Sequence, residues 1–236
     1  MSNAAYTDAY KKRWDDCQPL FITDNIAERK EVHLSDRYLL HICEYGGKVG
    51  DWNLYGSECS LVDCNSEAIS KWHSIDNNGD FYKIIKHSDG KEYLIFRQDL
   101  YGYSVLDIES REKMQFFPEK SLNSGADNET FIWTDIEYNP ISNVLAVTGC
   151  YWACPYNVHL FTFDNPMSEN QKFIDLRECF EPIECGYSIY CDVDFVKWEN
   201  DILHIKSLNT ETKIIETVEI EQSKYFKWLN EKGQEL

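Results

Sequence analysis

Two stretches decide the predicted fold of this chain, IKHSDGKEYLIF at residues 85–96 and IEYNPISNVLAV at residues 136–147. They align without a gap, and each is typical of a short strand, a polar turn and a second, more hydrophobic strand. The pattern recurs with a shorter turn at 32–42 and with one extra residue at 193–205. The four copies start 53, 51 and 57 residues apart. A pattern at a nearly constant period predicts a repeat architecture.

Each copy continues into further strand-like segments, which alternate in polarity and are rich in β-branched and aromatic residues. These segments are 57–65 with 69–75, 101–110 with 112–118, 156–165 with 172–178, and in the last copy 213–220 alone. Turn signals separate them at Asn77-Asn78-Gly79, Asp89-Gly90, Asn139-Pro140 and Asn165-Pro166. The sequence therefore predicts an all-β chain with repeats at about 31–76, 80–118, 131–178 and 188–220.

Four antiparallel strands every fifty-odd residues form the blade of a β-propeller. We therefore predict that residues 1–236 are one domain, a small β-propeller of about four four-stranded blades. An ordinary β-sandwich or two stacked sheets is the alternative. Short helices are expected at 4–16 and at 223–232, where apolar residues recur at helical spacing. The strand-like segment 19–24 belongs to no repeat, and we expect it to supply the missing outer strand and close the ring.

The fragment TDIEYNPISNVLAVTG, residues 134–149, resembles the inner-strand, turn and second-strand segment of WD-type propeller repeats. As a pattern, the resemblance covers about 190 residues, from 31 to 220. The Gly-His and Trp-Asp signatures of those repeats are missing at the corresponding places. The resemblance is therefore to an architecture, and it implies a fold built of blades without implying an activity.

The chain is strongly acidic, with 23 basic against 41 acidic residues and a net charge of −18. This balance argues against nucleic acid and anionic membranes as partners, because both require clustered cationic side chains. It favours solubility and attraction to a basic protein. The sequence has no apolar run long enough to span a membrane and no apolar leader, and it has nine cysteines. We therefore expect a cytoplasmic chain with reduced thiols.

Four carboxylates lie in register on two predicted inner strands, Asp135 with Glu137 and Asp192 with Asp194. Residues two apart lie on one face of a strand, so these acids are candidates to line a central channel. There they could bind Ca²⁺ or act as the acid and base of glycoside cleavage, although structural ion pairs are the simpler interpretation. The chain has no phosphate-binding glycine loop and no serine nucleophile elbow. We assign no catalytic residue, metal ligand or cofactor.

The connections between the second and third strands of the repeats are rich in aromatic residues. Trp and Tyr are typical anchors of binding interfaces, because they offer large contact areas at a small entropic cost. Packing between blades is the alternative use of such residues. The candidates are Tyr151, Trp152 and Tyr156, Trp52 and Tyr55, and Tyr101 and Tyr103.

The missing catalytic motifs and the aromatic connections favour a non-catalytic module that binds a protein or peptide, and the charge favours a basic one. One alternative is a carbohydrate-active hydrolase that uses the channel acids. Another is an acidic protein that neutralises a basic toxin or nuclease, as immunity proteins do.

Overall fold

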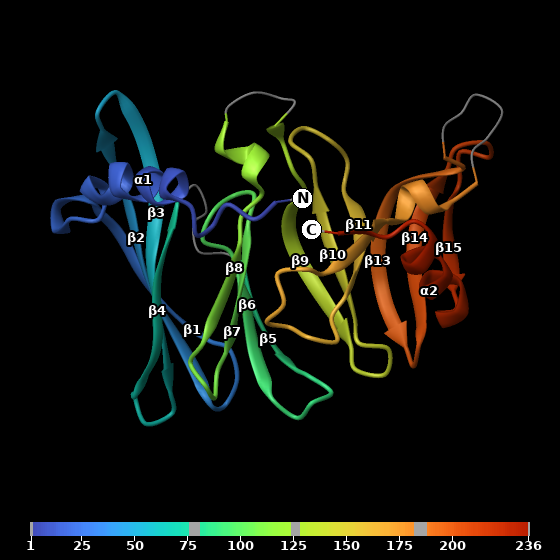
Figure 1. The fold of residues 1–236 in the computed structure, drawn as a ribbon, viewed down its shortest axis with the longest axis horizontal. Helices are drawn as coiled ribbons and strands as arrows, with labels where there is room; N and C mark the ends of the chain where they lie inside the picture. The colour runs from blue at the N-terminus through green and yellow to red at the C-terminus, as the bar shows by residue number, and fades with distance from the viewer. Residues whose placement is uncertain (1, 76–80, 124–127, 182–187, 236) are drawn as a thin grey trace. The chain divides into compact units, whose positions relative to one another are not determined.

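The computed structural model of the chain describes residues 2–75, 81–123, 128–181 and 188–235 (Figure 1). The predicted turn at Asn77–Gly79 lies outside the described residues, as does one of the nine cysteines, Cys185. The described residues form four antiparallel sheets, and the chain divides into two compact units. The N-terminal unit comprises residues 2–86 and 91–128, and the C-terminal unit comprises residues 87–90 and 129–236.

The N-terminal unit contains two four-stranded sheets in which consecutive strands pair, β1 to β4 and β5 to β8. Apolar side chains of both sheets, among them Leu40, Trp72 and Phe96, form one buried cluster, so the two sheets pack face to face. The strands are β1 (Ile26–His33), β2 (Tyr38–Val49), β3 (Trp52–Asp63), β4 (Ala68–Ile75), β5 (Tyr82–Lys86), β6 (Glu92–Phe96), β7 (Tyr103–Asp107) and β8 (Lys113–Phe116).

The C-terminal unit contains a five-stranded sheet in the order β16-β12-β11-β10-β9 and a three-stranded sheet, β13-β14-β15. Leu160 of the first sheet, Ile205 of the second and Tyr225 share one buried cluster. The strands are β9 (Ile132–Asn139), β10 (Val144–Cys150), β11 (Asn157–Thr162), β12 (Lys172–Asp175), β13 (Tyr190–Glu199), β14 (Ile202–Asn209), β15 (Ile215–Ile220) and β16 (Gln234–Glu235).

Tight turns join the strands within each sheet, and several contain a residue in the left-handed region. The φ angles of Gly50 and Gly90 are 59° and 90°, and those of Asn143 and Asn200 are 52° and 56°. Glycine and asparagine tolerate this conformation better than other residues, and the turns of antiparallel hairpins require it. These turns join the strands of four antiparallel sheets in the described residues, and the prediction of an all-β chain is confirmed.

Both predicted helices exist, as α1 (Asp8–Cys17) and α2 (Gln222–Glu231). α1 begins later than expected because the Thr7 hydroxyl accepts the N–H of Tyr10 and caps the helix. Before the cap, Asn3 instead forms a bridge to Pro118 beside the end of β8.

The expected strand at 19–24 is wrong, because this segment forms 3-10 turns at Gln18–Leu20 and Thr23–Asn25. The N–H groups of Phe21 and Asn25 bond the carbonyls of Gln18 and Ile22, at 3.1 and 3.0 Å, so these groups form local turns. Pro19 lacks the N–H that a ladder strand would use. The fourth sheet consequently has three strands, and the closed propeller and the single domain stay predictions.

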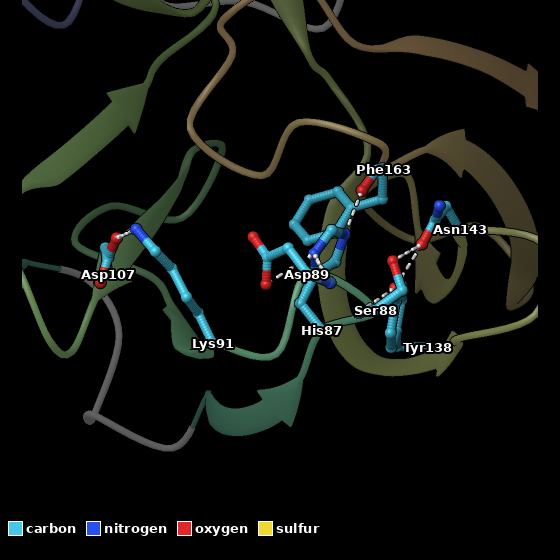
Figure 2. A network of polar contacts seen from close by, with 8 residues as sticks. All are labelled: His87, Ser88, Asp89, Lys91, Asp107, Tyr138, Asn143 and Phe163. Atoms are coloured by element: carbon cyan, nitrogen blue, oxygen red, sulfur yellow. Dashed lines mark hydrogen bonds and ion pairs between the residues drawn. The ribbon is translucent and has the colours of Figure 1, made fainter.

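Residues His87–Gly90 form the turn between β5 and β6 and belong to the C-terminal unit. Figure 2 shows the contacts of this turn. The His87 ring is 3% exposed, stacks on Tyr138, and its Nε2 lies 2.8 Å from the carbonyl oxygen of Phe163. The Ser88 hydroxyl donates to Oδ1 of Asn143 at 2.6 Å. Because these contacts hold a turn against a strand and its flanking loops, we interpret the His87 network as structural.

Figure 2 also shows a contact within the N-terminal unit, where Lys91 Nζ donates to Asp107 Oδ2 at 2.7 Å. The other oxygen of Asp107 accepts the N–H groups of Glu109 and Ser110, at 3.0 and 3.1 Å. Although burial opposes ionisation, the lysine and these N–H groups hold the pKa of Asp107 below its usual range. The carboxylate thus closes the β7–β8 turn.

Candidate binding surface at the β10–β11 loop

The β10–β11 loop, residues 151–156, joins the second and third strands of the five-stranded sheet. The N–H of Cys154 donates to the carbonyl of Tyr151 at 2.9 Å, which closes a turn inside the loop. Ala153 follows the exposed Trp152 with a φ of 58°, a left-handed conformation that residues other than glycine adopt only at some cost. The loop therefore has a defined backbone conformation.

Tyr151 anchors the base of this loop. Its half-buried ring meets Phe131 edge-on, with centroids 5.6 Å apart, and burial raises the pKa of its hydroxyl. Phe131 in turn lies over Gly149, where a Cβ would come within 2.7 Å of the Phe131 ring and 2.1 Å of the Ile132 carbonyl. Only glycine fits at this position, and because it has no side chain the Phe131 ring can lie close to the backbone of β10.

Beneath Tyr151 lies His159, whose side chain is 1% exposed. Its ring stacks on Phe131 with centroids 3.6 Å apart and on Phe173 at 5.6 Å. Nε2 lies 3.4 Å from Oδ2 of Asp175, and Nδ1 has no hydrogen-bond partner among the described residues. Burial lowers the pKa of His159, and the nearby Asp175 carboxylate only partly opposes this shift. The imidazole is therefore neutral at neutral pH.

Asp175 is the polar centre below the loop. Its Oδ1 accepts the side-chain amide of Asn157 at 2.6 Å and the N–H of Arg177 at 2.8 Å. Burial alone would raise the pKa of Asp175, but the His159 ring, the Asn157 amide and the Arg177 guanidinium together hold it well below its usual range. The carboxylate stays ionised and organises the start of β11 and the end of β12.

The outer part of the loop is exposed to solvent. Trp152 is 62% exposed and Tyr156 is 51% exposed, and Cys154 between them is also exposed. A loop with an anchored base that leaves two large aromatic side chains in water has the character of a recognition surface.

Trp52 and Tyr55, which were also predicted to bind, lie on β3 close to the β2–β3 turn and are 75% and 61% exposed. Tyr55 pairs with Gly46 across the hairpin, and a Cβ on that glycine would lie 3.3 Å from the tyrosine ring. Tyr55 therefore covers the backbone at Gly46, so this side chain has a structural role although it is largely exposed. Trp52 is the more exposed of the two side chains.

The prediction that Tyr103 belongs to a binding surface is wrong. Its side chain is 2% exposed on β7 and its ring packs against Phe116, with centroids 5.7 Å apart. Tyr101 is half-buried against a cluster that contains Tyr10 and Phe117. The connection between β6 and β7 therefore uses its aromatic residues for packing.

The four predicted channel acids lie on β9 and β13 of the C-terminal unit. Asp135, Asp192 and Asp194 are exposed, and Glu137 is partly buried. The strands are irregular at these acids, with register shifts next to Asp135 and Asp194 and a φ of 53° at Asp192. Among the described residues, no group of three or more His, Cys, Asp or Glu side chains could hold a metal ion.

A groove on the sheet β1–β4 was not predicted from the sequence. His41 and Glu58 line it, and Nδ1 of His41 lies 3.2 Å from Glu31. Glu58 pairs with Lys71 at 2.8 Å, and its carboxylate also lies 3.2 Å from Nε2 of His73. These charges are paired with one another, so the β10–β11 loop is the stronger candidate site.

His159 and Asp175 were not recognised from the sequence as a pair. The alternation of β11 contained a signal, because Asn157, His159 and Phe161 point to one face while Val158 and Leu160 point to the apolar cluster. The pairing of β11 with β12 places Asp175 opposite His159. That register depends on the length of the β11–β12 connection, which the sequence pattern leaves open.

No family model matches the chain. An uncharacterised protein of Acanthamoeba polyphaga mimivirus is 26% identical to it over 142 residues, which are 58% of this chain. The match covers 51% of the viral protein, so it extends over about half the length of that relative. In the part of the chain that the structure describes, no helix is long and apolar enough to cross a membrane.

Proposed function

We propose that this protein is a non-catalytic binding module whose β10–β11 loop presents Trp152 and Tyr156 to a protein or peptide partner. The observation that carries the proposal is the division of the loop into an anchored and an exposed part. Tyr151 packs on Phe131, whereas the neighbouring Trp152 is 62% exposed. Because the base is fixed, the exposed rings would lose little conformational freedom on binding.

The net charge of −18 favours a basic partner, which would approach faster through long-range attraction. The charge sets the rate and salt dependence of association, whereas the two aromatic side chains would supply most of the affinity. This division also suits the alternative of a protein that neutralises a basic toxin or nuclease. Such a protein would be a special case of the same binding module.

The test is affinity capture from the native cell with the wild-type chain, the double variant Trp152→Ala/Tyr156→Ala and the matched control Ile141→Ala. Ile141 is a similarly exposed apolar residue, 61%, in the turn at the opposite end of β10. We expect proteins retained by the wild-type chain and the control to be lost with the double variant. Equal retention by all three would contradict the proposal.

We also propose that the four sheets are blades of one small propeller. The support is their antiparallel succession along the chain and the packing of neighbouring sheets within each unit. A compact domain of this length has a radius of gyration of about 17–18 Å. Small-angle X-ray scattering measures this quantity, and a value well above about 20 Å would contradict a closed ring.

A further inference from the structure

The outer edges of two sheets are protected by the ends of the chain. β16 pairs with β12 in the C-terminal unit, at Lys172 and Phe173. In the N-terminal unit the N–H of Ala4 donates to the carbonyl of Phe117 at 2.7 Å, just beyond β8. Such coverage matters, because an unpaired edge strand is a template for pairing with another chain.

The three-stranded sheet has no such protection at β15. In the described chain, β15 pairs with β14 and with no other strand. At the start of β15, Ile214 and Ile215 are 60% and 69% exposed, and the Glu219 side chain further along is 68% exposed. The other edge of the same sheet, β13, has two register shifts and Lys197, which are devices that prevent edge pairing. β15 is regular and contains neither proline nor lysine.

The direction of the free backbone groups follows from the hairpin. The N–H of Asn209 donates to the carbonyl of Ile214 at 2.9 Å. Because ladder bonds alternate along an antiparallel pair, the backbone groups of Ile215, Thr217 and Glu219 point away from β14. β15 therefore offers a row of outward donors and acceptors at every second residue.

We propose that β15 is a docking site for an extended basic segment of another protein, which adds to the sheet as its fourth strand. Val218 and Ile220 face the buried cluster of the C-terminal unit, so apolar residues of the added strand would extend that cluster. Glu216 lies on the same face and accepts a hydrogen bond from the Tyr190 hydroxyl at 3.0 Å. The opposite face carries Ile215, Thr217 and Glu219, all exposed. A strand that alternates apolar with Lys or Arg residues fits both faces.

Charge also selects between this partner and a second copy of the chain. Glu211, Glu219 and Glu221 are exposed on and beside β15, and the nearby cations are Lys213 and, opposite Thr217 on β14, Lys206. Each copy carries a net charge of −18, so pairing of two β15 edges would bring like charges together. A basic segment would instead be attracted to this edge.

The test uses a fluorescein-labelled peptide of alternating valine and lysine, with binding measured by fluorescence anisotropy at about 100 mM salt. Thr217→Pro removes one outward N–H without removing a bond to β14, and proline is tolerated at such an edge position. We expect this variant to bind the peptide at least about tenfold more weakly, whereas the matched control Thr217→Ala binds within about twofold of the wild type.

A charge reversal provides the second measurement if Thr217→Pro fails to fold. Glu219→Lys should weaken binding of the valine–lysine peptide and strengthen binding of a valine–glutamate peptide. The proposal is overturned if a scrambled peptide of the same composition binds equally well, or if neither variant changes binding. It is also overturned if sedimentation shows a dimer that Thr217→Pro abolishes. Ile141→Ala removes an exposed apolar side chain in the turn before β10 and should bind the peptide like the wild type.

Discussion

The β6–β7 and β10–β11 connections occupy the same topological position in their sheets, but they use their aromatic residues in opposite ways. In the N-terminal unit, helix α1 covers the β6–β7 connection, where Asp99 accepts the Tyr10 hydroxyl at 3.1 Å and pairs with Arg13 at 2.9 Å. In the C-terminal unit, Trp152 of the β10–β11 loop stays 62% exposed. Coverage by a segment distant in sequence therefore accounts for the half-buried state of Tyr101, whereas Trp152 remains in solvent.

The largest expected effect on the free energy of unfolding concerns Tyr103, the buried tyrosine that follows the β6–β7 connection. Tyr103→Ala should lower the free energy of unfolding by about 3–5 kcal/mol, because it leaves a cavity beside Phe116. Urea unfolding followed by circular dichroism measures this loss. Tyr103→Phe keeps the ring and should lose less than half as much. A loss below about 1 kcal/mol for Tyr103→Ala would mean that this connection is not a packing element.

The second prediction concerns the polar support of the exposed loop. Asp175→Ala removes the acceptor for the Asn157 amide and the Arg177 N–H, and leaves these buried donors unpaired. We expect a loss of about 2–3 kcal/mol in the free energy of unfolding. The control is Asp164→Ala, at an exposed position, which should change stability by less than about 0.5 kcal/mol. Equal effects of the two variants would contradict a supporting role for Asp175.

The third prediction is a dependence on pH. Because burial lowers the pKa of His159 in the folded state, the unfolded chain binds this proton first as the pH falls below about 6.5. His159 therefore reduces stability on acidification, by at most about 1.4 kcal/mol per pH unit, until the pH passes its folded pKa. Asp175 acts in the same direction only below about pH 4, because its folded pKa is depressed.

The measurement is the difference in unfolding free energy between pH 7 and pH 5. His159→Phe keeps a ring between Phe131 and Phe173 but cannot titrate, so it should lose less stability than the wild type over this range. An unaltered pH dependence in His159→Phe would show that this buried ring does not contribute.

The sequence predicted the strands well because each signal is local. Alternating polarity and turn residues placed β9 and β10 within a few residues of their observed bounds. The helical spacing of Tyr225, Phe226, Trp228 and Leu229 predicted α2, in which all but Phe226 are buried. The failures concern contacts between distant segments. The strand expected at 19–24 is replaced by turns with local hydrogen bonds, and the burial of Tyr103 and the His159–Asp175 pair depend on packing and strand register.

The smallest effect on stability is expected at Trp152, the exposed tryptophan of the β10–β11 loop. Because the Trp152 side chain is mostly in water, Trp152→Ala should change the free energy of unfolding by less than about 1 kcal/mol. Tyr151→Ala, one residue earlier, should lower the free energy of unfolding by more, since it removes the ring that packs on Phe131.

If Trp152 anchors a partner, the same Trp152→Ala change should weaken binding by about 2 kcal/mol, or roughly thirtyfold. Urea unfolding separates the two roles before any partner is identified. A loss of 3 kcal/mol or more for Trp152→Ala would assign this side chain to packing, and the loop would then lose the feature on which the binding proposal rests.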